Sequence, residues 1–261
     1  MTRLAKYCFF QFTKPLPIQV QYSIIMGKIA RFIRPRINEF IIKTEETEMI
    51  KMISLLLVVL FLCDGASAQD LKPISLPKPD TTGGQPLMKV LKDRQSTREF
   101  SADTLTLTTL SNLLWAGCGV NRAESGKRTA PSAMNWQEVS IYVATSHGLY
   151  LYDEKNYALQ PILAEDIREK TGAQPFVKEV PVNLIYVADM TKANRGSESD
   201  KDLYSGADAA FIAENIYLFC ASEGLATVVR GSVDRAELSK VMKLRPEQKI
   251  ILAQSVGYPK K

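Results

Sequence analysis

One apolar run decides which part of this 261-residue chain can fold into a domain. The run covers residues 52–63, about a dozen residues, whereas a helix that spans a membrane needs roughly 20. Lys51 precedes it, and the sequence Ala-Ser-Ala, which ends at Ala68, follows it. A positive residue, a short apolar stretch and an Ala-x-Ala site are the three parts of a secretory signal peptide. We therefore expect a signal peptide over residues 49–68, cleavage after Ala68, and a secreted or periplasmic mature chain.

Residues 1–48 show no clear periodicity, and we interpret them as a non-native upstream extension or a tail. In this interpretation translation starts at Met49 or Met52. The alternative is a cytoplasmic tail that precedes a membrane anchor. The short apolar run and the Ala-x-Ala site favour the signal peptide, so we expect no stable membrane anchor after cleavage.

The excess of positive charge lies mainly before the predicted cleavage site. The whole chain has a formal net charge of +5. Residues 1–68 hold nine Lys and Arg and five Asp and Glu, whereas residues 69–261 hold 24 and 23. The mature chain therefore lacks the basic excess that nucleic-acid binding needs, and we expect no nucleic-acid partner.

The mature chain shows the pattern of one α+β domain after a flexible leader over residues 69–84. Apolar residues at helical spacing predict helices over residues 87–91, 107–117, 202–224 and 234–242. Thr106 is a candidate N-cap of the second of these helices. Alternating or β-branched residues predict strands over residues 139–144, 149–152, 182–188, 225–229 and 250–256. Helices come first and strands mixed with helices follow, which favours a sheet that is covered by helices.

The first stretch that can carry chemistry is Arg94-Gln95-Ser96-Thr97-Arg98, after the first predicted helix. Two guanidinium groups four residues apart can converge on one dianionic phosphate, and the hydroxyl between them adds a further donor. A solvated basic helix end has the same residue types. The pattern alone therefore leaves both interpretations open.

Two further stretches can contact a flat ligand. Residues 131–137, Pro-Ser-Ala-Met-Asn-Trp-Gln, combine turn-forming residues with the amides of Asn135 and Gln137, which both donate and accept. After the strand over residues 225–229, Gly231 offers a backbone that a ring can approach closely. A polar loop and a simple strand exit are the alternatives.

Other reactive residues are few. His147 is the only histidine, in a predicted hairpin turn, so a multi-histidine metal site is excluded by count and we expect no metal. No Gly-x-Gly-x-x-Gly follows a predicted strand and no Gly-x-Ser-x-Gly is present, which disfavours a Rossmann dehydrogenase and a hydrolase. Cys118 and Cys220 are the only cysteines after Ala68, and the sequence leaves open whether they pair.

Together and in this order, these motifs resemble the FMN-dependent nitroreductase family. The resemblance covers residues 85–259 and includes Arg-x-Ser-x-Arg, Pro-Ser-Ala-x-Asn-x-Gln, a late Gly-Leu-x-Thr and a terminal Val-Gly-Tyr-Pro. Residues 114–117, 121–122 and 128–133 look most like its SagB-type dehydrogenase branch. The resemblance implies a nitroreductase-like α+β fold over residues 85–261, with a central, mostly antiparallel sheet flanked by helices, in an intertwined homodimer.

The resemblance also implies that FMN binds at the subunit interface. The residues that it assigns to the phosphate and ribityl chain are Arg94, Gln95, Ser96 and Arg98, with added charge from Lys260 or Lys261. Those that it assigns to the flavin ring are Pro131, Ser132, Ala133, Asn135 and Gln137. Gly231 and the backbone of Arg230 would face flavin N5. No catalytic side chain is implied, because the cofactor carries the chemistry.

The function that this resemblance implies is that of an exported FMN-dependent oxidoreductase. It would transfer hydride or electrons through flavin N5, from a reductant to a small organic acceptor such as a nitroaromatic or a quinone. NAD(P)H is the usual donor in the family but is scarce outside the cytoplasm, so the donor stays open. The alternative is a catalytically silent flavin-binding or interaction domain on the same fold.

Overall fold

The computed structural model describes residues 71–260. The predicted signal peptide, the segment before it and Lys261 lie outside the described residues. Among the helices of residues 71–260, none combines the length and the hydropathy that crossing a bilayer requires.

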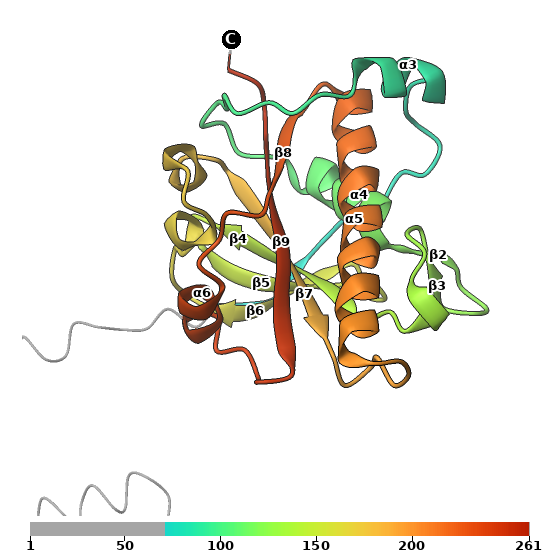
Figure 1. Cartoon of the computed structure of the whole chain (residues 1–261). Coiled ribbons are helices and arrows are strands. Elements are labelled where there is room, and N and C mark those ends of the chain that lie inside the picture. The colour runs from blue at the N-terminus through green and yellow to red at the C-terminus, as the bar shows by residue number, and fades with distance from the viewer. Residues whose placement is uncertain (1–70, 261) are drawn as a thin grey trace, which may run out of the picture. The chain divides into compact units, whose positions relative to one another are not determined.

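A seven-stranded antiparallel sheet forms the centre of the fold over residues 71–260 (Figure 1). Its strands follow the order β1-β6-β5-β4-β7-β9-β8. Their bounds are Ile74–Ser75 (β1), Val139–Thr145 (β4), Gly148–Asp153 (β5), Ala158–Leu163 (β6), Val182–Asp189 (β7), Ala226–Arg230 (β8) and Gln248–Gly257 (β9). A separate ribbon pairs β2 (Val120–Arg122) with β3 (Lys127–Arg128). The predicted central antiparallel sheet is confirmed.

Helices cover both faces of this sheet. Their bounds are Leu87–Asp93 (α3), Leu107–Cys118 (α4), Glu198–Glu223 (α5) and Arg235–Val241 (α6). Successive residues of a strand point to opposite faces, so β4 contributes to two cores. Ile141 and Val143 pack in the core that includes Ile216 of α5, whereas Tyr142 packs in the core that includes Leu238 of α6. Figure 1 accordingly shows α5 and α6 on either side of β9.

Helix α5 begins earlier than the predicted start at residue 202. The side chain of Ser197 accepts the N–H of Asp200, and the Asp200 carboxylate accepts the N–H of Ser197, which makes a capping box. The first turn is polar, so apolar periodicity could not reveal it. The helix ends as predicted before Gly224, whose φ of 70° lies in the left-handed region that favours glycine. The predicted N-cap of α4 is also confirmed, because Thr106 accepts the N–H of Thr109.

The leader differs from the flexible segment that the sequence predicts. In its described part, Ile74 and Ser75 form β1 and pair with β6. Leu76 is buried, and the Ser111 hydroxyl donates to the Pro77 carbonyl at 2.5 Å. The apolar residues between the prolines therefore anchor this segment to the edge of the sheet and to α4.

Cys118 and Cys220 are free, buried thiols on α4 and α5. Burial raises the pKa of the Cys118 thiol to about 12 and also raises the pKa of the Cys220 thiol. Both thiols therefore stay protonated near neutral pH and pack as small apolar groups rather than as nucleophiles.

Candidate functional site

Arg94 and Ser96 lie against one tyrosine of α5, at the outer edge of β8. The hydroxyl oxygens of Ser96 and Tyr217 are 2.8 Å apart, and the N–H of Val229 donates to the same tyrosine oxygen at 2.9 Å. The guanidinium carbon of Arg94 lies 5.4 Å from the centre of the Tyr217 ring. The segment that follows α3 is therefore attached to α5 and to β8 through one side chain.

Backbone hydrogen bonds tie the rest of this segment to β8 and to the C-terminal tail. The N–H of Thr97 donates to the Thr227 carbonyl at 2.9 Å, and the N–H of Lys260 donates to the Glu99 carbonyl at 3.3 Å. Figure 1 shows the C-terminus and α3 at this same end of the molecule. The structure thus places six of the predicted site residues, which we call the donor cluster, along the outer edge of β8 or next to it: Arg94, Gln95, Ser96 and Arg98 in the docked segment, Lys260 in the tail bonded to that segment, and Gly231 one residue past the end of the strand. All of them except the half-buried Arg94 are exposed.

The side chain of Arg230 points into the protein, away from this surface. It is 4% exposed and donates to the Thr171 carbonyl, the Asn183 amide oxygen and the Ser255 hydroxyl. Burial lowers the pKa of its guanidinium to about 10, so the group stays charged at neutral pH. The predicted role of the Arg230 backbone beside a flavin stays a prediction, and the side chain joins β8 to its neighbours.

Residues 131–137, which we call the amide loop, have a strained backbone. Met134, Asn135 and Gln137 have φ angles of 50°, 55° and 49°. Residues other than glycine rarely adopt this left-handed region, and each such residue costs roughly 1–3 kcal/mol in unfavourable cases. Strain of this kind collects at ligand-binding segments, where the surrounding structure imposes it.

Hydrogen bonds inside the amide loop impose this conformation and leave one donor group facing outward. The Ser132 hydroxyl accepts the N–H of Gln137 at 3.0 Å, and the Gln137 side-chain amide donates to the Asn135 oxygen at 3.2 Å and to the Gly126 carbonyl at 3.0 Å. Asn135 is exposed, and within residues 71–260 its Nδ2 group donates to no partner. The loop can therefore offer amide hydrogens to a carbonyl acceptor.

Two buried carboxyl groups lie next to the amide loop, and one of them bonds its backbone. Asp208 of α5 is 3% exposed and accepts the N–H of Ala133 at 2.8 Å. Glu138, at the end of the loop, is fully buried, and within the described residues its carboxylate oxygens have no hydrogen-bond partner. Burial raises the pKa of Asp208 to about 6, and the nearby Glu138 carboxyl adds to this effect, although the Ala133 N–H opposes it.

This acid pair predicts a pH-dependent stability. The folded chain binds a proton at Asp208 more tightly than the unfolded chain, because its folded pKa lies above the ordinary value of 3.8. The free energy of unfolding should therefore fall as pH rises from about 4 to about 6, by on the order of 1–3 kcal/mol. Glu138→Gln supplies an amide donor to Asp208 and should stabilise the protein more at about pH 7.5 than at about pH 5.

Denaturant unfolding at the two pH values measures this difference. Glu179→Gln removes an exposed carboxylate and serves as the matched control, with equal small effects at both pH values. Equal stabilisation by Glu138→Gln at both pH values would contradict the raised pKa of Asp208.

The donor cluster and the amide loop do not meet within one chain. The loop contacts α5 at Asp208, and the donor cluster contacts α5 at Tyr217. Asp208 and Tyr217 are nine residues apart in sequence, which corresponds to a rise of roughly 14 Å along the helix axis and to about two and a half turns. The side chains of Asp208 and Tyr217 therefore point to opposite sides of α5. The amide loop and the donor cluster thus form two separate half-sites, and Gly231 lies with the donor cluster.

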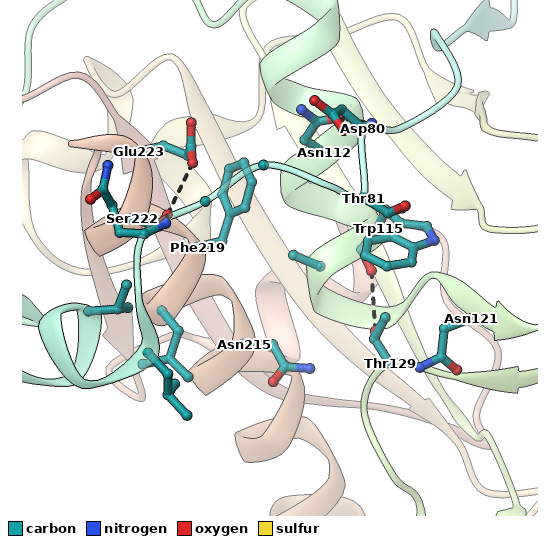
Figure 2. Close-up of a pocket in the computed structure, with 17 residues that line it drawn as sticks. Asp80, Thr81, Asn112, Trp115, Asn121, Thr129, Asn215, Phe219, Ser222 and Glu223 are labelled. Carbon is teal, nitrogen blue, oxygen red and sulfur yellow. Dashed lines mark hydrogen bonds between the residues drawn. The ribbon is translucent and has the colours of Figure 1, made fainter.

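A cleft of about 470 Å³ lies between the leader, α4 and α5. Figure 2 shows Trp115 and Phe219 on its walls, with Asn112 and Asn215 from the two helices. None of the predicted cofactor residues lines this cleft. It belongs to the outer surface of the α4 and α5 pair and not to either half-site.

Three residues near the half-sites were missed in the sequence. Asp208 had a signal, because it is a charged residue among the buried positions Ser205, Ala209 and Ile212 of α5. No sequence signal marked Tyr217 or Glu138, because a tyrosine beside an apolar stripe of a helix and a glutamate before a strand are common in proteins.

Comparisons with known proteins agree on one family. The model of the nitroreductase family matches residues 91–258. A curated protein of Methanocaldococcus jannaschii, provisionally named a nitroreductase, is 30% identical over 169 residues. That alignment covers 61% of this chain and 85% of the relative.

Solved structures share the fold. A crystal structure from Ralstonia eutropha JMP134, provisionally named a nitroreductase, is 42% identical with a TM-score of 0.71. It covers 75% of this chain and 93% of the other. The NADPH:FMN oxidoreductase of Vibrio harveyi, solved in complex with NAD+, is 20% identical with a TM-score of 0.51 and covers 67% and 69% of the two chains. At that identity the likeness shows the fold alone.

Proposed function

The chain belongs to the nitroreductase family of oxidoreductases, and from this premise we propose that it binds FMN through the donor cluster and the amide loop. Bound FMN would supply a ring that takes up hydride at N5 and passes it, or electrons, to a small acceptor such as a nitroaromatic or a quinone. The reductant would be NAD(P)H or another donor. We also propose the SagB-type branch, and export after cleavage at Ala68, on the sequence motifs described above.

The observation that carries this proposal is the composition of the donor cluster. Two arginines and a serine hydroxyl belong to the segment that is docked along the outer edge of β8, and the N–H of Lys260, which is distant in sequence, donates to Glu99 of the same segment. Guanidinium forks and a hydroxyl are the donors that a phosphate dianion accepts most strongly. Arg94, Ser96 and Arg98 therefore fit the phosphate, with Gln95 beside them.

The remaining predicted residues fit a flat ring. A side chain added at Gly231 would meet no atom within 4 Å, so the space beside this backbone is open to a ligand. The outward Nδ2 group of Asn135 suits a ring carbonyl, and the strained backbone around it is preorganised for that contact. Pro131, Ser132 and Ala133 would lie along the ring.

We further propose that a second copy of the chain completes the site. Because the half-sites leave α5 on opposite sides, the amide loop of one chain can meet only the donor cluster of another around one FMN. Large apolar side chains are exposed along α5 and in the amide loop, at Leu203, Tyr204, Phe211 and Met134. Several large exposed apolar side chains on one helix and on the loop bonded to it support a protein interface here.

The first experiment is a flavin measurement on the purified protein, which we expect to be yellow. Arg94→Ala and Arg98→Ala should each weaken FMN binding by about 1.5–3 kcal/mol, because each removes a charge-assisted hydrogen bond. Quenching of FMN fluorescence gives the dissociation constants. Lys155→Ala is the matched control, because the turn between β5 and β6 lies toward the opposite edge of the sheet from β8.

Three results separate the outcomes of this experiment. A colourless protein that ignores added FMN contradicts the proposal. Unchanged affinity in both arginine variants removes them from the site. Bound FMN without turnover of nicotinamides, nitroaromatics or quinones favours the catalytically silent domain.

A further inference from the structure

Tyr217 connects two residues of the donor cluster, Arg94 and Ser96, to the outer edge of β8. Strand β8 is at the end of the sheet order, so its outer edge has backbone groups that no neighbouring strand pairs. The Tyr217 hydroxyl fills one of these positions by accepting the N–H of Val229. The N–H of Thr97 fills another by donating to the Thr227 carbonyl. The segment with Arg94 and Ser96 is thus docked along this edge.

The hydrogen-bond directions around Tyr217 follow from its single hydroxyl hydrogen. The N–H of Val229 can only donate, so the tyrosine oxygen accepts at that contact. The tyrosine hydrogen then remains for the Ser96 oxygen, 2.8 Å away. A phenol is also a stronger acid than an alkyl alcohol, and successive hydrogen bonds in one direction strengthen each other. The favoured chain runs from Val229 through Tyr217 to Ser96.

This direction has a consequence for the Ser96 hydroxyl. Because Ser96 accepts from the tyrosine, its own hydrogen is free to point outward into the donor cluster. We propose that Tyr217 is a positioning residue that turns the Ser96 hydroxyl into a donor for the FMN phosphate. The proposal rests on the proposed function and names a residue that acts on the cofactor only through Ser96 and Arg94.

The Tyr217 ring positions Arg94 in addition. The guanidinium stacks over the ring at 5.4 Å, a distance at which a cation is attracted to the aromatic face. The ring itself is held by the hydrogen bond to Val229. One side chain thereby orders two of the donors that would meet the phosphate, which lowers the entropy that binding must remove from them.

The test compares FMN with riboflavin, which has the same ring and no phosphate. Tyr217→Phe keeps the ring under Arg94 and removes the hydroxyl. It should weaken FMN binding about 5- to 20-fold and leave riboflavin binding within about twofold. Ser96→Ala should show the same selective loss. The double variant should lose no more than the larger single effect, because both changes remove one donor.

Tyr142→Phe is the matched control. The Tyr142 side chain packs in the core on the α6 side of the sheet, and its hydroxyl accepts a hydrogen bond from the Gln248 side chain at 3.4 Å. We expect it to leave the ratio of the two dissociation constants unchanged. Should Tyr217→Phe fail to fold, Tyr217→Leu is the second variant at this position. It removes the hydroxyl and the ring together, and it should weaken FMN binding at least as much while riboflavin binding stays within about twofold.

The results that overturn the proposal are distinct from those that overturn the function. Equal weakening of FMN and riboflavin by Tyr217→Phe assigns the hydroxyl a purely structural role and overturns the inference. Unchanged FMN affinity, or additive losses in the double variant, also overturns it. An unaltered protein that binds neither flavin overturns the proposed function and the inference with it.

Discussion

In the proposed dimer, Phe211→Glu should separate the two chains and give a monomer that no longer retains FMN. Phe211 is 48% exposed on α5, and the exposed Leu203 and Tyr204 lie about two turns earlier on the same helix. In a twofold-symmetric dimer the substitution occurs twice and buries two unpaired carboxylates in an apolar contact. Each costs several kcal/mol, so the dimer dissociation constant should rise at least about 1,000-fold.

Sedimentation and FMN fluorescence measure the two consequences separately. Phe211→Leu keeps an apolar side chain at the same place and should leave both the dimer and FMN binding in place. If the Phe211→Glu protein stays dimeric, the interface must lie on a surface that does not include Phe211. A monomer with full FMN affinity would mean that one chain holds both half-sites, against the separation of Asp208 and Tyr217 along α5.

The secondary structure was predictable wherever a local pattern specifies it. Thr106 caps α4 and Gly224 ends α5 through contacts within a few residues, and these positions were found. Strand β6 was missed because Pro161 interrupts its pattern. Proline is tolerated there because β1 pairs only with Ala158 and Leu159, which leaves the outer side of Pro161 without a strand that needs its N–H.

The candidate site was predictable in its residue types but not in its arrangement. The motifs around Arg94 and Asn135 are continuous in sequence, so their donors could be named from it. The contacts that hold these motifs join residues that are far apart in sequence. Ala133 and Asp208 are 75 residues apart, and Ser96 and Tyr217 are 121 residues apart. Only the folded chain shows that the two motifs face opposite sides of α5. The homodimer, which the family resemblance implies, stays a prediction that this separation of the two motifs supports.

Arg230→Met should lower the free energy of unfolding by about 3–5 kcal/mol, because it leaves buried acceptors without their donor. The carbonyl of Thr171, the amide oxygen of Asn183 and the hydroxyl of Ser255 all receive N–H groups from this one side chain. For a domain of this size the midpoint of thermal unfolding should fall by about 10 °C or more. A methionine fills similar volume but donates nothing.

Arg235→Met is the matched control for this variant. Arg235 also donates to two carbonyls, those of Ile250 and Ile251, but it does so from an exposed position. Water can replace an exposed donor, so the loss there should stay below about 1 kcal/mol. If Arg230→Met instead kept its thermal midpoint and lost FMN, the guanidinium would act on the cofactor. The buried hydrogen bonds of Arg230 to Thr171, Asn183 and Ser255 would then not be what requires an arginine at this position.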